Sequence, residues 1–215
     1  MNKKLKNKII TKHLALNPSL HGFSMIELVV VIGIFSFISA IILGNYNGFN
    51  QKMSVSNLAH QIALEIRQAQ VYGLSAKESV IGSGVFPGYG IYFSRDIPTS
   101  FVLYTDANGD KKYNHTGDGT NCSANSECLE SVSVSNGDVI KDICATVSGV
   151  TKCASVSQID FVNVVFTRPD PEATITGTLS GSDVIYDNLQ ISVETPKKDF
   201  FKTVWVWSTG QVSIQ

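Results

Sequence analysis

The sequence predicts an α+β protein in which one long N-terminal helix packs on an antiparallel β-sheet domain. Residues 21–43 form an apolar run, residues 53–79 repeat apolar side chains every three or four positions, and later segments alternate with a period of two. The 215 residues have room for one membrane segment and one domain of about 140 residues, which is enough for a hydrophobic core.

The apolar run reads HGFSMIELVVVIGIFSFISAIIL and is long enough to cross a bilayer as a helix. Glu27 supplies its one carboxylate. An acidic side chain inside a bilayer costs about 2.5–3.5 kcal/mol, so it usually has a partner and a function. We therefore predict that residues 23–43 span the membrane and that Glu27 has a functional role.

Charge is unevenly distributed along the chain. The first 22 residues contain five lysines and no acid, whereas the remainder has 12 basic and 18 acidic side chains. The positive-inside rule places the N-terminus in the cytoplasm and exports the acidic remainder, as in a single-pass protein of the inner or cytoplasmic membrane. The net negative charge of the exported part disfavours nucleic acid, which is also negatively charged, as a partner.

Residues 1–22 form a basic segment, MNKKLKNKIITKHLALNPSLHG, that ends in the small residue Gly22. A secretory signal is cleaved after its apolar run, whereas here the small residue precedes that run. Cleavage at Gly22 would leave the apolar helix on the mature protein. An uncleaved signal-anchor is the other interpretation.

A second helical pattern follows the apolar run. Its apolar positions recur at spacings of three and four: Val55, Leu58, Ile62, Ile66 and Ala69. The simplest structure is one helix from about Phe23 to Gly73. In this interpretation residues 44–76 pack one stripe on the soluble domain.

Residues 77–215 are predicted to form the extracytoplasmic β-rich domain. Short β-branched and aromatic runs are separated by Gly and Pro: VIGSGVF, GYGIYF, FVLYT, QIDFVNVVFT, EATITGT, NLQISVE, KTVWVWS and QVSIQ. SVSVSNGDVIKDI is predicted to be a hairpin around Asn136–Gly137, and Thr209–Gly210 joins the last two strands. Residues 107–130 are nearly free of apolar side chains, which favours a surface loop.

All four cysteines lie in the predicted exported part: Cys122, Cys128, Cys144 and Cys153. An even number on the oxidising side of a membrane favours two disulfides, and three pairings can be drawn. Pairing neighbours, Cys122 with Cys128 and Cys144 with Cys153, is the most natural because each pair brackets a short segment. A zinc site is the alternative, although the sequence has no CxxC.

The basic leader, Gly22, Phe23 and the run SMIELVVVIGIFSFISAIIL with Glu27 near its start resemble the class III signal of the type IV pilin and type II secretion pseudopilin superfamily. The resemblance implies a pilin-like fold. It also implies that a prepilin peptidase cuts after Gly22 and methylates the amine of Phe23.

The same resemblance implies further partners: other pilin or pseudopilin subunits, an inner-membrane assembly platform and membrane lipid. In a filament Glu27 would pair with the N-terminal amine of a neighbouring subunit, because pairing offsets the burial of both charges. The other interpretation is that this carboxylate reaches the membrane interface by snorkelling.

Segments farther along the chain resemble the GspH/FimT branch of minor pilins and pseudopilins: LAHQIALEIRQAQVYGLSAKESV, GYGIYF, FVLYTDANGDKKYN and WVWSTGQVSI. DNA-binding members of that branch have an arginine-containing basic C-terminus. QVSIQ has neither arginine nor lysine, so direct DNA capture is not expected. A small basic area remains at Arg168, Lys197, Lys198 and Lys202.

Three residues have oxygen ligands at positions one, three and five of an EF-hand-like loop: Asp106, Asn108 and Asp110. Calcium is therefore the one cofactor that the sequence suggests, with Asp118 as a further candidate ligand. Lys111 stands where such loops have glycine, and no glutamate closes the loop. The alternative is a turn at Asn108–Gly109 with acidic flanks.

Catalytic motifs are absent from the sequence, which has no GxSxG, no HExxH and no P-loop, so we predict that the chain is not an enzyme.

Trp205 and Trp207 share one face of a strand and either pack in the core, which is favoured, or form a contact patch.

These observations predict a structural minor pilin or pseudopilin subunit of a type IV pilus or type II secretion system. The alternative is a membrane-anchored surface module that binds a ligand, an adhesion partner or DNA.

Overall fold

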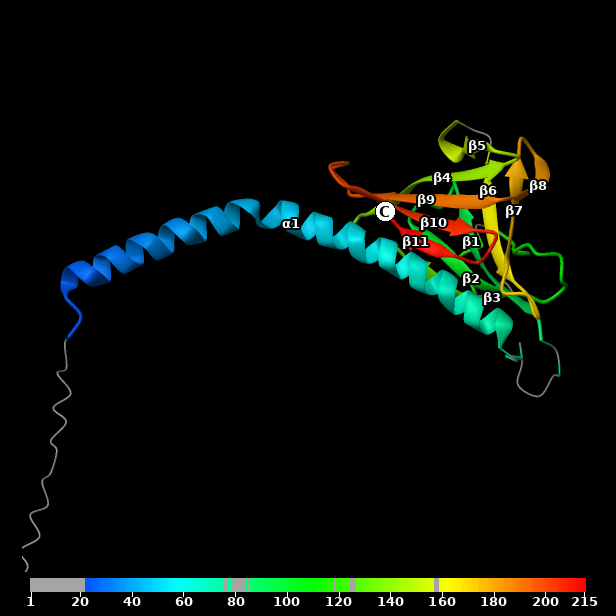
Figure 1. The fold of residues 1–215 in the computed structure, drawn as a ribbon, viewed down its shortest axis with the longest axis horizontal. Coiled ribbons are helices and arrows are strands. Elements are labelled where there is room, and N and C mark those ends of the chain that lie inside the picture. The colour runs from blue at the N-terminus through cyan, green and yellow to red at the C-terminus, as the bar shows by residue number, and fades with distance from the viewer. Residues whose placement is uncertain are drawn as a thin grey trace, which may run out of the picture. The chain divides into compact units, whose positions relative to one another are not determined.

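The computed structural model describes residues 22–75, 77–78, 84, 86–117, 119–123, 127–156 and 159–215. Two compact units make up the chain, residues 1–45 and residues 46–215 (Figure 1). The first 21 residues of the predicted leader and most of the VIGSGVF segment lie outside the described residues.

Helix α1 spans Met25–Leu74, so the prediction of one long helix is confirmed. The sequence has no proline between these residues, and the helix is continuous through Gly44. Gly73, in the last turn of the helix, lies at a close approach, because an added Cβ would lie 2.4 Å from the backbone oxygen of Phe166. A larger residue at this position would push α1 away from the sheet behind it.

The amphipathic part of α1 belongs to the same compact unit as the strands. All five apolar residues of its predicted stripe are buried, together with Ala59 and Ala63. The small alanines lie between the larger side chains of the stripe, which lets the helix approach the sheets closely.

The described residues form eleven strands, which pair into two antiparallel sheets. The six-stranded sheet has the order β3-β2-β1-β6-β7-β8, with bounds β1 Gly88–Ser94, β2 Ser100–Asp106, β3 Cys128–Ser133, β6 Phe161–Phe166, β7 Ala173–Leu179 and β8 Ser182–Tyr186. The five-stranded sheet has the order β11-β10-β9-β4-β5, with bounds β4 Val139–Val147, β5 Val150–Cys153, β9 Asn188–Glu194, β10 Phe201–Trp207 and β11 Val212–Ile214. A short 3-10 turn, η1 Ala154–Val156, follows β5.

The predicted hairpin around Asn136–Gly137 is wrong. Both residues have the positive φ angles of a tight turn, 62° and 75°. However, β3 before the turn pairs with β2, and β4 after it pairs with β5 and β9. The turn therefore carries the chain from one sheet to the other. By contrast, the predicted turn at Thr209–Gly210 does join two paired strands, β10 and β11.

One core lies between α1 and the inner faces of both sheets. The α1 stripe contributes Ile62 and Ile66, the six-stranded sheet contributes Phe93 and Phe166, and the five-stranded sheet contributes residues such as Ile191. All five are fully buried. The hydrophobic effect of this shared core holds the helix and the sheets in one unit.

A second, smaller core covers the outer face of the six-stranded sheet. Tyr92 and Tyr104 point to this face, and Tyr113 from the 107–127 segment packs on both, with ring centroids 5.2 and 5.1 Å away. The predicted surface loop, residues 107–130, is thus correct in part: most of its described residues are exposed, but Tyr113 and Glu127 are buried and the last three residues belong to β3. Gly90 makes room for the stack, since an added Cβ would lie 2.9 Å from the ring of Tyr104.

Candidate functional site

The predicted processing site lies at the beginning of α1. Gly22 and Phe23 are exposed and precede the helix, whose first residue is Met25. Ser24 caps the helix, because its Oγ accepts a hydrogen bond from the backbone N–H of Glu27 at 3.2 Å. Glu27 is thus an exposed carboxylate in the first helical turn, where the helix dipole favours negative charge.

The segment after this cap exposes its apolar side chains on every side. Residues Met25–Gly44 are long and apolar enough to cross a membrane, and none of the segment is buried by the described chain. Exposed side chains include Ile34 and Phe37, which are 56% and 70% accessible. A helix that is apolar all round requires an apolar environment, either lipid or other helices.

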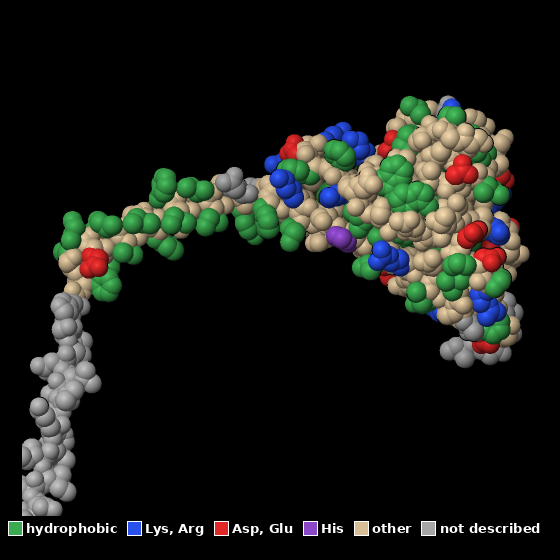
Figure 2. All heavy atoms as spheres, in the orientation of Figure 1, with side chains coloured by type: hydrophobic (Ala, Val, Ile, Leu, Met, Phe, Trp, Pro, Cys, Tyr) green, Lys and Arg blue, Asp and Glu red, His purple; other side chains and the backbone are tan. Residues whose placement is uncertain are grey.

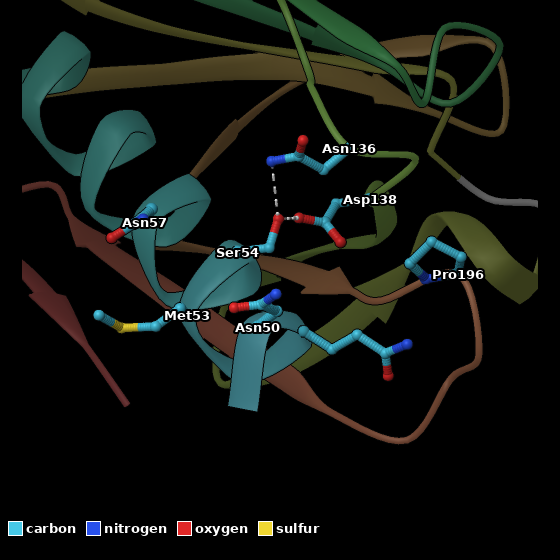
Figure 3. A pocket seen from close by; sticks show the side chains of 8 residues that line it. Asn50, Met53, Ser54, Asn57, Asn136, Asp138 and Pro196 are labelled. Carbon is cyan, nitrogen blue, oxygen red and sulfur yellow. Dashed lines mark hydrogen bonds between the residues drawn. The ribbon is translucent and has the colours of Figure 1, made fainter. Parts of the chain in front are cut away.

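Where α1 begins to pack on the domain, it is tied to the turn between β3 and β4. Ser54 Oγ donates a hydrogen bond to Asp138 Oδ2 and accepts one from Asn136 Nδ2 at 3.1 Å (Figure 3). The Asp138 carboxylate is buried. A pocket of about 430 Å³ lies beside these residues and is lined mainly by amide side chains, including Asn50 and Asn57.

The predicted calcium residues form a closed turn after β2. Asp106 is buried, and its two carboxylate oxygens accept the backbone N–H groups of Gly109 and Lys111 at 2.8 and 3.0 Å. Asn108 Oδ1 accepts the N–H of Asp110 at 3.0 Å. Lys111 adopts a φ of 61°, the left-handed conformation that usually favours glycine.

Glu127 closes the same segment from its other end, and the sequence analysis missed it. Its two carboxylate oxygens accept the N–H groups of Ala107 at 3.2 Å and Asn114 at 2.7 Å. The side chain is buried although it lies 21 positions after Asp106. Its place before the disulfide-bonded Cys128 was the one available signal.

Burial dominates the electrostatics of this segment. It raises the pKa of Asp106 and of Glu127, while hydrogen bonds from backbone N–H groups act in the opposite direction. Burial, followed by the charges of these two carboxylates, also raises the pKa of Tyr104. Asp110 has a lowered pKa, because hydrogen bonds led by that from Asn114 outweigh the effect of burial.

The carboxylates of this segment do not meet at one point. Among the described residues, one group of three His, Cys, Asp or Glu side chains has ligand atoms within 4.8 Å of one another, and it consists of Asp142, Cys144 and Cys153. Both sulfurs of that group belong to a disulfide. The structure instead gives Asp106 and Glu127 a role in holding backbone N–H groups. Calcium at the Asp106 turn stays a prediction, and Asp118 lies outside the described residues.

Two disulfides join the cysteines that are neighbours in the sequence, Cys122 with Cys128 and Cys144 with Cys153. The first closes the segment that carries Glu127. The second links β4 to β5 at residues that are also paired across the strands. Both therefore stabilise local structure in the domain.

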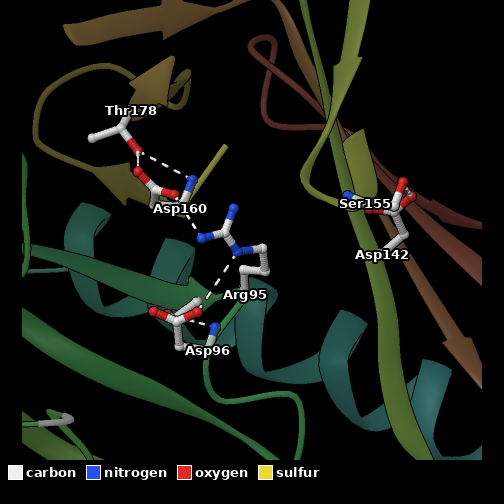
Figure 4. A network of polar contacts seen from close by, with 7 residues as sticks. Arg95, Asp96, Asp142, Ser155, Asp160 and Thr178 are labelled. Atoms are coloured by element: carbon white, nitrogen blue, oxygen red, sulfur yellow. Dashed lines mark hydrogen bonds and ion pairs between the residues drawn. The ribbon is translucent and has the colours of Figure 1, made fainter. Parts of the chain in front are cut away.

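A polar network at the other end of the domain is structural. Arg95 Nη2 lies 3.0 Å from Asp160 Oδ1, which joins the segment after β1 to the segment before β6 (Figure 4). Asp142 accepts hydrogen bonds from the backbone N–H and the hydroxyl of Ser155. Arg95 and Asp160 are partly exposed, and such pairs contribute about 0–1 kcal/mol.

The two tryptophans are not core residues, which corrects the favoured interpretation. Val204 and Val206 of β10 are buried, whereas Trp205 and Trp207 are half-buried on the opposite face. Their rings stack with centroids 5.7 Å apart. They form a stacked aromatic pair on the outer face of the five-stranded sheet, and a role as a contact patch stays a prediction.

Comparison with family models, with curated proteins and with solved structures finds no match to this chain.

Proposed function

We propose that the chain is a structural minor subunit of the type IV pilin and pseudopilin superfamily that resembles the GspH/FimT branch. A prepilin peptidase cuts it after Gly22, and the mature chain waits in the membrane as a single-pass protein. An assembly platform then incorporates it, through α1, into a type IV pilus or the pseudopilus of a type II secretion system. This role requires no catalytic chemistry of the chain itself.

One observation carries the proposal. A single helix begins three residues after Gly22, exposes apolar side chains on all sides over Met25–Gly44, and then buries one apolar stripe in the core of a β domain. An ordinary signal sequence does not need to share a helix with the folded domain. A subunit that assembles through its helix does, because the helix must transmit its position to the domain.

The beginning of α1 also supports the role proposed for Glu27. The Ser24 cap places this carboxylate in the first turn, four residues after Phe23. Cleavage after Gly22 would create a positive amine on Phe23 in the same short segment. In a filament a neighbouring subunit then has a positive group to offer Glu27, and pairing offsets the burial of both.

Mass spectrometry of the membrane form tests the maturation step. We expect a chain that begins at N-methylated Phe23, and a Gly22→Val variant that keeps its leader. An intact Met1 in the wild-type protein would contradict the proposal and favour the membrane-anchored binding module.

A second experiment tests assembly. We expect Glu27→Ala and Glu27→Gln to reduce incorporation into filaments by about tenfold or more, because each leaves the partner amine buried without its charge. Glu27→Asp keeps the charge and should retain part of the incorporation. Membrane insertion is the control and should be unchanged in all three. Normal incorporation of Glu27→Gln would refute the charge pairing.

A further inference from the structure

An apolar groove of about 380 Å³ lies between α1 and the beginning of β10. Met53, Val55 and Ser56 of α1 line it together with three aromatic and two basic residues: Phe49, Lys52, Phe200, Phe201 and Lys202. We call these five residues the aromatic–lysine patch. All of them belong to the compact unit of residues 46–215.

The patch is exposed although it is largely apolar. Phe49 is 62% and Phe201 is 68% accessible. Lys52 Nζ lies 4.6 Å from the centroid of the Phe200 ring, a cation–π contact that joins α1 to the β9–β10 connection. Clustered exposed aromatic side chains of this kind mark an interaction surface.

The β9–β10 connection next to the patch is an ordered turn with two more lysines. The backbone of Thr195, which is buried, accepts the N–H of Lys198 and donates its own N–H to the carbonyl of Phe200, at 2.9 and 3.0 Å. Lys197 and Lys198 are exposed on this turn. The turn therefore places both lysines in the short connection that leads into Phe200 and Phe201.

Positive charge is concentrated at the patch, although the domain as a whole has a negative net charge. Residues 46–215 contain 12 basic and 17 acidic side chains, which gives a net charge of −5. The patch and its turn contain four lysines and one acid, Asp199. Glu194, at the edge of the patch, is already paired with Lys141 at 3.2 Å. Figure 2 shows lysine and hydrophobic side chains gathered where this turn meets α1.

The patch follows closely after the candidate membrane span. Gly44 is the last residue of the span, and Phe49 is five residues later. Five residues of α-helix rise about 7.5 Å, and even five extended residues reach only about 18 Å. The headgroup layer on each side of a bilayer is about 5–8 Å thick. Chain reach alone therefore keeps Phe49, the first residue of the patch, within about 18 Å of the headgroups of a membrane crossed by Met25–Gly44.

We propose that the aromatic–lysine patch docks the β domain on the headgroups of anionic lipids in the same membrane that α1 crosses. The aromatic rings enter the interfacial layer, where amphipathic and aromatic groups are favoured, and the lysines contact lipid phosphates. Docking holds the unassembled subunit in one orientation on the bilayer. The inference rests on the membrane-spanning part of the proposed function and not on filament assembly.

Fluorescence quenching in the full chain tests the docking. All four native cysteines are in disulfides, so a new cysteine can be labelled alone. We would place a bimane probe at Lys197→Cys, which removes one positive charge and so biases the experiment against the proposal. The matched control is Ser135→Cys, on the exposed β3–β4 turn that contacts α1 through Ser54. This turn lies near the same part of the helix without aromatic or lysine neighbours in its sequence.

Each labelled chain is reconstituted in phosphatidylcholine vesicles with or without phosphatidylglycerol, and with a headgroup spin-labelled lipid as quencher. We expect at least about twofold stronger quenching at position 197 than at position 135, and only when phosphatidylglycerol is present. Lys52→Gln combined with Lys202→Gln should lower the signal at 197 to that at 135. Circular dichroism and an unchanged unfolding transition verify that these variants fold.

Equal quenching at the two positions in anionic vesicles would overturn the docking. So would an excess at 197 that persists without phosphatidylglycerol, or one that grows with the protein-to-lipid ratio, which would indicate a second copy as the occupant. Alkaline carbonate extraction separates the two proposals. A chain that resists extraction but shows equal quenching overturns only the docking, whereas a chain that carbonate releases overturns the membrane anchor as well.

Discussion

The two parts of α1 have the same backbone and opposite surroundings. Residues Met25–Gly44 have no buried side chain, whereas the part within residues 46–74 buries a stripe that runs from Val55 to Ala69. The first part is apolar on all faces and the second on one. The difference shows that one helix is adapted to two environments, and that its first part depends on a partner outside the folded domain.

The largest expected effect comes from adding charge to the first part. Ile34→Asp combined with Phe37→Asp should cost about 5–7 kcal/mol of insertion free energy and make the chain extractable by alkaline carbonate. The matched variant is Leu64→Asp with Val71→Asp, at two apolar residues of the second part that are each 62% exposed. It should remain in the membrane. Equal behaviour of the two variants would remove the distinction between the parts.

Truncation of an apolar side chain should destabilise the domain in the second part of α1 and not in the first. Ile62 is fully buried, so Ile62→Ala should lower the free energy of unfolding of the domain by about 2–5 kcal/mol. Ile34→Ala, at an exposed residue of the first part, should leave it unchanged. Urea unfolding of the full chain in detergent, followed by tryptophan fluorescence, measures both. A loss of stability in the Ile34 variant would show that the first part also packs on the domain.

Two glycines, one in each part of α1, test the same comparison with a smaller expected loss of stability. Gly73→Ala would bring its Cβ to 2.4 Å from the Phe166 carbonyl oxygen, so we expect a loss of about 1–3 kcal/mol, or about 2–12 °C in melting temperature. Gly33→Ala meets nothing within 4 Å and should not lower the melting temperature. If both variants melt like the wild type, α1 can move away from the sheet without loss.

The smallest effect depends on pH. Burial and then the charge of Glu130 raise the pKa of Glu65, so protonation stabilises the folded chain. This contribution is complete below the ordinary glutamate pKa of about 4.3 and is lost as the pH rises through the folded value. Glu65→Gln should therefore melt above the wild type at pH 7, with a difference that vanishes in acid. The exposed Glu172→Gln is the control. A difference that does not change with pH would contradict the assignment.

Local sequence patterns were sufficient to predict the long helix and most strands of the described residues. Helix α1 and its buried stripe followed from apolar spacing and the absence of proline, because these depend on residues within a few positions of one another. The same holds for most strands, although β5 and β8 were missed because they are short and carry polar residues.

The candidate sites were predictable to different degrees. Gly22, Phe23 and Glu27 lie within six consecutive residues, so a local pattern can contain them, and their role in processing and assembly stays a prediction. Glu127 was not predicted, because its function depends on Asn114 and Ala107, which lie on the other side of a disulfide-closed segment. The aromatic–lysine patch joins residues about 150 positions apart in the chain, so no local pattern contains it.

By itself the sequence determined the torsions and periodicities of this protein: a capped apolar helix, its amphipathic continuation, and a positive-φ turn at Asn136–Gly137. Only the tertiary structure decided which strands that turn connects, and which face of β10 Trp205 lies on. The reason is physical. Torsion preferences arise from neighbouring atoms, whereas strand partners and buried faces are chosen by the apolar surface that the whole chain can remove from water.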